Sequence, residues 1–133
     1  FERIHFHEEL TSYGHEDTLY GKDLQAEGIV MRYIDNPVFH DIFDSSETFL
    51  EKTETGLLNA CRYPNLMKGH VRILDIQQRC KRAGLQPLIR FLFAIFEKPL
   101  RRNLLGKRPK LRAFDLYKLG YICRLDHRMK QAR

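Results

Sequence analysis

The sequence has 133 residues, of which 43% are hydrophobic and 30% are charged. This length and composition fit one globular domain or part of one, and no stretch reaches the roughly 18 apolar residues of a membrane-spanning helix. Three widely spaced cysteines (Cys61, Cys80 and Cys123) with no C-x-x-C pair argue against a disulfide scaffold or zinc knuckle and favour the reducing cytoplasm. The chain begins with Phe1 and carries no signal-peptide pattern, so we expect a piece of a longer protein.

Charge divides the chain into two parts. Residues 1–62 hold 5 Lys and Arg against 13 Asp and Glu, a net charge of −8, whereas residues 63–133 hold 18 against 4, a net charge of +14. Such a division indicates parts with different partners. The acidic part suits a site that handles cations, and the basic part suits an anionic membrane surface, a lipid phosphate or a nucleic acid.

The first predicted elements are a helix and a strand. Residues 15–27 have a helical pattern that opens on the acids Glu16 and Asp17, which complement a helix dipole, and Gly28 suits the position just past the helix end. Residues 29–34, IVMRYI, are rich in β-formers and predict a mostly buried strand. Residues 35–37, DNP, end this strand, because proline cannot donate to a ladder.

The remaining pattern is helical. Residues 44–47, DSSE, resemble a capping box at the start of a helix that frays near residues 63–64. A basic amphipathic helix is expected over residues 71–83, closed by Gly84, and Pro87 opens an apolar helix that residues 97–99, EKP, stop. Residues 101–110 form a basic connector, and a last helix covers residues 111–125.

A helix–strand pair favours a binding site, because α/β units bind ligands at helix N-termini and at the carboxyl ends of strands. Glu16 and Asp17 lie at the first of these ends and His40 follows the second. An ionised carboxylate can take a proton from a substrate hydroxyl, and a neutral imidazole can bind a divalent metal. The alternative is that the two acids only complement the helix dipole and that His40 is structural.

Several motifs in residues 1–60 resemble a family 2 glycosyltransferase, specifically the C-terminal portion of a bacterial member with the GT-A fold. YGHED at 13–17 matches the family's Y-G-x-E-D element at a helix start, and TLYGKDL at 18–24 is similar to its D-x-x-x-G-x-x-L continuation. YIDNPVFH at 33–40 resembles the family's HIDNPVxH landmark, and FLEKTETGL resembles the helix after it. FDLYKLGY at 114–121 is similar to C-terminal tails of some bacterial members.

The resemblance implies a role for each residue of the element. Asp17 corresponds to the catalytic base that deprotonates the acceptor hydroxyl, and Glu16 helps to hold the acceptor sugar. Tyr13, Gly14 and His15 belong to the same acceptor-binding element, and His40 completes a metal site in several branches of the fold. The reaction implied is inverting transfer of a sugar from a nucleotide-sugar donor to a hydroxyl of a glycan or lipid-linked acceptor in polysaccharide synthesis.

The fold implied is α/β: residues 1–62 as the C-terminal half of a Rossmann-like GT-A domain, and residues 63–133 as a basic helical extension. The family's D-x-D metal motif is absent from the sequence, as is the N-terminal βαβ region that binds the nucleotide. We therefore expect the isolated chain to be inactive, with the other ligands of a Mn²⁺ or Mg²⁺ ion outside it. The metal neutralises the leaving diphosphate.

The basic part allows further hypotheses. Residues 85–105 are either a core helix or an interfacial element that binds an anionic leaflet beside a basic cluster, which places the enzyme on the inner face of the cell membrane. The cluster contains Arg101, Arg102, Lys107, Arg108, Lys110 and Arg112.

A function of a different class is that of a non-catalytic module that binds nucleic acid. Aromatic residues do not interleave with the basic ones, however, and no known nucleic-acid-binding motif is present. A small metal hydrolase using Glu16, Asp17 and His40 lacks an H-x-x-x-H-type pair.

Overall fold

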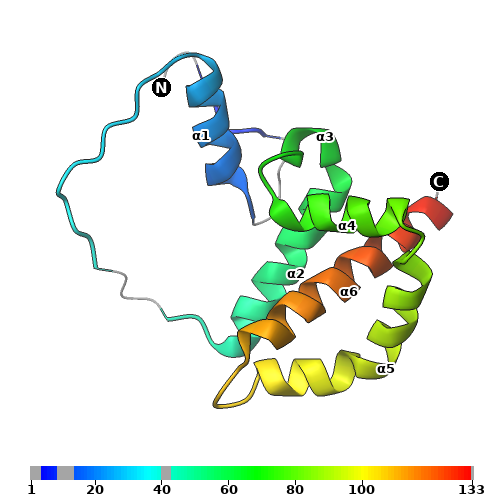
Figure 1. The fold of residues 1–133 in the computed structure, drawn as a ribbon. Helices are drawn as coiled ribbons and strands as arrows, with labels where there is room; N and C mark the ends of the chain where they lie inside the picture. The colour runs from blue at the N-terminus through cyan, green and yellow to red at the C-terminus, as the bar shows by residue number, and fades with distance from the viewer. Residues whose placement is uncertain (1–3, 9–13, 40–42, 133) are drawn as a thin grey trace.

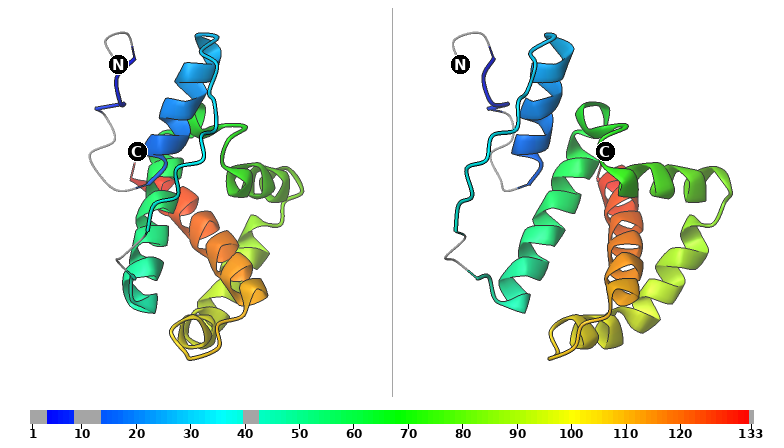
Figure 2. Two further views of the ribbon diagram at one scale, coloured as in Figure 1. Left: turned by 90° about the vertical axis from the view of Figure 1, so that its left-hand side faces the viewer. Right: turned by 60° about the vertical axis from the view of Figure 1, so that its left-hand side comes forward.

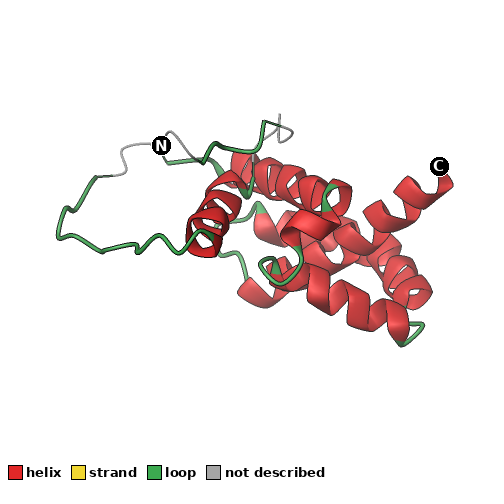
Figure 3. Cartoon of the chain, turned by 90° about the horizontal axis from the view of Figure 1, so that it is seen from above, coloured by secondary structure: helices red, strands yellow, loops and turns green. Residues whose placement is uncertain are grey.

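The computed structural model describes residues 4–8, 14–39 and 43–132. These residues form helices and connecting loops, with no strand among them (Figures 1 and 3). The first helix, α1, spans Glu16–Ala26, as the sequence predicts. It ends where Gly28 adopts a left-handed φ of 69°, a conformation that glycine accepts without steric cost.

The prediction of an α/β, Rossmann-like GT-A fold is wrong for this structure. Residues 29–34 form no strand, and every residue from Ile29 to Phe39 is exposed. In Figure 1 this extended segment arcs away from the helices. A strand is stabilised by ladder hydrogen bonds to a neighbour, and the described residues contain no second strand to supply them. High β-propensity alone therefore did not decide the structure of this segment.

Helix α2 spans Ser46–Arg62 and ends at Tyr63, as predicted. Its N-cap is Ser45, whose side chain accepts a hydrogen bond of 3.1 Å from the Thr48 amide. Asp44, the predicted cap, instead pairs with Lys52 at 2.7 Å. The N-cap thus lies one residue later than expected, because the serine hydroxyl is the group that accepts from a free amide of the first turn. With Thr48 three residues after the cap, the expected capping box is not formed.

Two shorter helices follow. The sequence analysis missed α3, a single turn at Pro64–Met67, but predicted α4, which spans Arg72–Arg82 and is followed by Gly84 with a φ of 68°. Met67 and Leu74 of these helices are buried. The turn of α3 therefore places an apolar side chain, Met67, in the core just after the point where the preceding helix was expected to fray.

Helix α5 spans Gln86–Leu104 and has Pro87 in its first turn. The prediction that residues 97–99 end it is wrong, because the helix continues through Pro99. An internal proline removes one backbone hydrogen bond and bends a helix, and α5 is visibly bent in Figure 1. Burial of Leu104 and the ion pair from Arg101 to Glu54 stabilise the helical turns beyond the proline.

The last helix, α6, spans Leu111–Gln131 and lies between α2 and α5 (Figure 2). One hydrophobic cluster joins α1, α2, α3, α4 and α6, and a second joins α2, α5 and α6. The first cluster contains Leu19 and Leu57 together with Met67 and Ile122, so buried residues from both sides of position 62 share one core. The division into domains at residue 62 stays a prediction.

Candidate functional site

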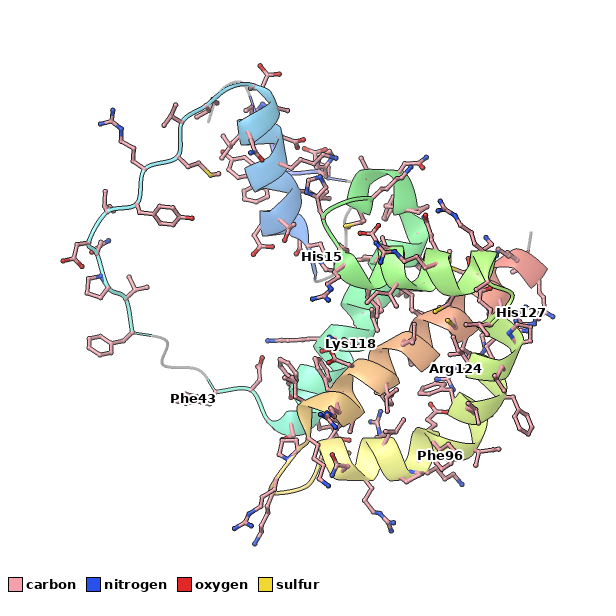
Figure 4. The ribbon with its side chains drawn as sticks, viewed as in Figure 1. His15, Phe43, Phe96, Lys118, Arg124 and His127 are labelled. Atoms are coloured by element: carbon pink, nitrogen blue, oxygen red, sulfur yellow. The ribbon has the colours of Figure 1, made fainter. Side chains whose placement is uncertain are left out.

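The site lies in a cleft of about 930 Å³ between the start of α1, the middle of α2 and the start of α4. Figure 4 labels His15 on one side of this region and Lys118 of α6 on another. Most of the polar side chains around the cleft are charged or can titrate. They include His15, Glu16, Asp17, Asp44, Lys52, His70, Arg72 and Lys118.

Two glycines set how closely the start of α1 approaches α2. Gly14 has a φ of 122°, and a Cβ added to it would lie 2.8 Å from the Cα of Gly56. Real Cβ atoms do not approach backbone this closely, so a side chain at Gly14 would push the loop away from α2. Leu19, one turn into α1, is buried against Leu57 of α2 in the same cluster. The glycine pair and this leucine anchor the first turn of α1 at the edge of the cleft.

His15 precedes α1 in a left-handed conformation, with a φ of 74°. A non-glycine residue in this region carries strain of order 1–3 kcal/mol, and such residues cluster at functional sites. Burial lowers the pKa of His15, although Asp17 and Glu16 oppose the shift. The imidazole is therefore neutral at pH 7 and able to accept or donate a hydrogen bond at the cleft.

The carboxylate of Glu16 is engaged in hydrogen bonds within the chain. Both oxygens of its carboxylate accept a hydrogen bond of 2.9 Å from the Gly14 amide. This contact closes the loop onto the first helical turn, much as a capping residue does. The carboxylate of Glu16 thus positions the loop. Because it is engaged in this way, Glu16 is a poor metal ligand for the hydrolase that the sequence analysis considered.

Asp17 differs from its neighbour. Its residue is exposed, and its Oδ1 accepts a hydrogen bond of 2.7 Å from the Thr18 amide. In the described part of the chain, its Oδ2 has no hydrogen bond or ion pair. Asp17 therefore presents one free carboxylate oxygen at the cleft.

The other walls of the cleft supply cations. Lys52 pairs with Asp44, and Lys118 pairs with Asp115 at 3.0 Å and lies 4.4 Å from the ring centroid of Phe114. Arg72, the first residue of α4, is exposed and has no ion pair among the residues described. The cleft thus combines a free carboxylate oxygen with an unpaired guanidinium, an arrangement suited to a ligand that carries both hydroxyl and anionic groups.

The structure brings Gly14, His15, Glu16 and Asp17 together at the helix start, as the motif predicts. Tyr13 and His40 lie outside the described residues. The described part of the chain contains no group of three His, Cys, Asp or Glu side chains placed to hold a metal ion. The Mn²⁺ or Mg²⁺ site therefore stays a prediction.

Sequence reasoning missed the contribution of Arg72 and the contact between Gly14 and Gly56. The sequence showed Arg72 only as a member of a basic helix, with no sign that it lines the same cleft as Asp17. The glycine of FLEKTETGL sits inside α2, where glycine is unfavourable. That unfavourable position was the one available signal of a close approach.

Two of the three cysteines, Cys61 and Cys123, show no sign of nucleophilic use. Burial, the largest cause in both cases, raises the pKa of Cys61 to about 12 and that of Cys123 to about 11. A thiol reacts as its thiolate, so both side chains are unreactive near neutral pH.

Comparison with known proteins identifies no relative: no family model, no curated protein and no solved structure matches the chain. In the ranges that the structure describes, none of the helices has the length and apolar character required to cross a bilayer.

Proposed function

We propose that this chain is part of a glycosyltransferase and that it carries the general base and acceptor side of the site. The observation that supports the proposal most directly is the contrast between Glu16 and Asp17. The YGHED element places both acids at a helix start, but only Asp17 has a free carboxylate oxygen at a cleft. This is the arrangement that a base needs in order to reach a bound hydroxyl.

In the proposed reaction, Asp17 accepts the proton of an acceptor hydroxyl. The acceptor oxygen forms a bond to C1 of the donor sugar, while the bond from C1 to the diphosphate oxygen breaks and its electron pair leaves with the nucleoside diphosphate. Attack from the side opposite the leaving group inverts the configuration at C1. Asp17 is suited to this step because its exposed carboxylate has one oxygen without a hydrogen bond or ion pair among the described residues, and that carboxylate lines the cleft.

The other cleft residues bind and orient the acceptor. Neutral His15 can exchange hydrogen bonds with sugar hydroxyls, and Arg72 can bind an anionic group such as the phosphate of a lipid-linked acceptor. Glu16 acts as a positioning residue, since it holds the loop through Gly14. The proposal requires the donor site to be supplied from outside these 133 residues, and any Mn²⁺ or Mg²⁺ would neutralise the leaving diphosphate there.

The test uses the protein expressed from its complete reading frame, with Asp17→Asn as the main variant. Release of nucleoside diphosphate is measured with a panel of nucleotide sugars and a mixed glycan acceptor pool. Loss of a general base is expected to lower the rate about 10²- to 10⁴-fold, with little change in donor binding. Glu27→Gln, which removes a negative charge from the opposite end of α1, is the matched control and should retain activity.

Two results would contradict the proposal. One is an Asp17→Asn protein that transfers sugar at the normal rate, and the other is a complete protein that turns over no member of the panel. Turnover by the isolated 133 residues would instead contradict the requirement for an external donor site. Circular dichroism of each variant confirms that the helices are retained.

A further inference from the structure

Helix α5 has a wide apolar face, one edge of which packs against α6 and α2. Its inner side buries Phe93 and Leu104 against α6 and α2. Its outer side carries five large hydrophobic residues that are 43–64% exposed: Leu88, Phe91, Leu92, Ile95 and Phe96. Side chains this large and apolar are normally buried where a helix has a packing partner. The outer side of α5 therefore lacks a partner within the described residues.

The spacing of these five residues makes them one surface. Positions 88, 91, 92, 95 and 96 follow the i, i+3, i+4, i+7, i+8 pattern of a single helical stripe. We call this set the α5 stripe. Its edge continues into an apolar groove of about 540 Å³ between α5 and α6, which Leu92, Phe96 and Leu116 help to line. Figure 4 places Phe96 at the bend of α5, on the side of the molecule away from α1.

Basic side chains extend the surface of the α5 stripe toward the C-terminal end of the helix. Lys98 and Arg102 follow Phe91 and Ile95 at helical spacing on α5, and the loop after it adds further basic side chains. We define the basic cluster as the exposed residues Lys98, Arg102, Lys107, Arg108, Lys110 and Arg112. No ion pair to any of them is present in residues 4–8, 14–39 and 43–132. The cluster is therefore an unneutralised block of positive charge.

The structure also removes one residue from the cluster expected from the sequence. Arg101 reaches α2, where it pairs with Glu54 at 3.2 Å and with Glu47 at 3.7 Å. The nearby acids are engaged as well, since Glu97 pairs with Arg124 and Asp115 with Lys118. Acidic neighbours thus neutralise Arg101 and leave the outer cations unpaired.

The combination of an apolar stripe with unpaired cations favours one of three possible partners: a second copy of the chain, a nucleic acid or an anionic bilayer. A second copy of the chain would bring two basic clusters together, which like charges oppose. A nucleic acid would bind the cations but leave the stripe in water. An anionic bilayer satisfies both, because the headgroup boundary accepts an apolar helix face and lipid phosphates attract the cations.

We propose that the outer face of α5 docks on an anionic lipid bilayer, with the α5 stripe in the boundary between headgroups and acyl chains and the basic cluster on the lipid phosphates. This inference is independent of glycosyl transfer. Asp17→Asn is expected to leave membrane binding unchanged, so the failure of one proposal can be told from the failure of the other.

The test is flotation of the 133-residue chain with two kinds of vesicle, pure phosphatidylcholine and phosphatidylcholine mixed with phosphatidylserine. Binding is expected only to the mixed vesicles, and added salt should weaken it. A stripe variant, Phe91→Ser with Ile95→Ser, and a charge variant, Lys107→Glu with Arg108→Glu, should each lower the partition coefficient on the order of tenfold or more. All four positions are exposed, so the fold should be retained.

Matched control variants make the same kinds of substitution outside the α5 stripe and the basic cluster. Val30→Ser with Tyr33→Ser deletes exposed apolar side chains from the extended segment, and Arg79→Glu with Arg82→Glu reverses two exposed charges of α4. Both controls should still float with the mixed vesicles.

Three outcomes would overturn the proposal. The first is flotation that ignores phosphatidylserine or survives the stripe variant. The second is a stripe-dependent dimer, detected by light scattering, with no vesicle binding. The third is binding of duplex DNA, lost in the charge variant but not in the stripe variant, in place of vesicle binding.

Discussion

Two apolar regions of this chain differ in how far their side chains are buried. Residues 29–39 carry seven large hydrophobic side chains that are 47–104% exposed, and they form neither helix nor strand. Helices α2, α5 and α6 carry similar side chains but bury Leu50, Phe93 and Tyr117 in a shared cluster. The difference teaches that hydrophobic and β-forming residues do not create structure without a partner surface. Helices satisfy their backbone groups internally, whereas a strand depends on its neighbours.

The strongest test of this comparison uses isoleucine in both regions. Ile122 of α6 is 0% exposed and Ile34 of the extended segment is 79% exposed. Ile122→Ala is expected to lower the free energy of unfolding by about 2–5 kcal/mol through lost burial and a cavity, whereas Ile34→Ala should change it by less than about 0.5 kcal/mol. Urea denaturation followed by circular dichroism measures both. Equal losses would mean that the extended segment packs in solution.

Glycine gives a second matched pair with effects of opposite sign. A Cβ on Gly120 would overlap the ring of Phe93, where α6 and α5 touch, whereas a Cβ on Gly21 of α1 meets nothing within 4 Å. Gly120→Ala should cost about 1–3 kcal/mol through overpacking, and Gly21→Ala should stabilise its helix by up to about 1 kcal/mol. Thermal unfolding of the two variants distinguishes them. A neutral Gly120→Ala would show that α5 and α6 are not tightly packed.

A pair of tyrosine substitutions is expected to give the smallest change in unfolding free energy of the three pairs. The Tyr117 hydroxyl donates a 2.5 Å hydrogen bond to Glu54, so Tyr117→Phe should cost on the order of 1 kcal/mol. Tyr33→Phe should have no effect, because that ring is fully exposed. The same variants are compared in urea at neutral pH.

The pH profile sharpens the tyrosine test. Burial and the bond to Glu54 raise the pKa of Tyr117, so its contribution to stability is complete below about pH 10 and is lost as the pH rises further. Cys61 and Cys123, with raised pKa values, contribute in the same direction. Tyr117→Phe should therefore reduce the alkaline loss of stability without abolishing it, and Tyr33→Phe should leave it unchanged. An identical profile in both variants would contradict the buried position of Tyr117.

Local signals predicted the helices well. Gly28 and Gly84 mark helix ends, and Pro87 marks a helix start, because each effect depends on the conformation of one residue and its near neighbours. The two largest errors involve interactions that are distant in sequence, whereas the shifted cap of α2 and the missed turn α3 are local. Residues 29–34 needed a partner strand, and α5 continued past Pro99 because Leu104 and Arg101 contact other helices.

For the candidate site, the sequence by itself placed Glu16 and Asp17 in the first turn of a helix, since acids at that position interact with the exposed amides of the same few residues. Only the tertiary structure decided that Glu16 turns back to Gly14 while Asp17 keeps a free oxygen at the cleft, and that Arg72 lines the same cleft. It also decided which cations face outward, since Glu47 and Glu54 hold Arg101. The physical reason is that helix starts depend on local backbone groups, whereas the availability of a charged side chain depends on which distant residues fold against it.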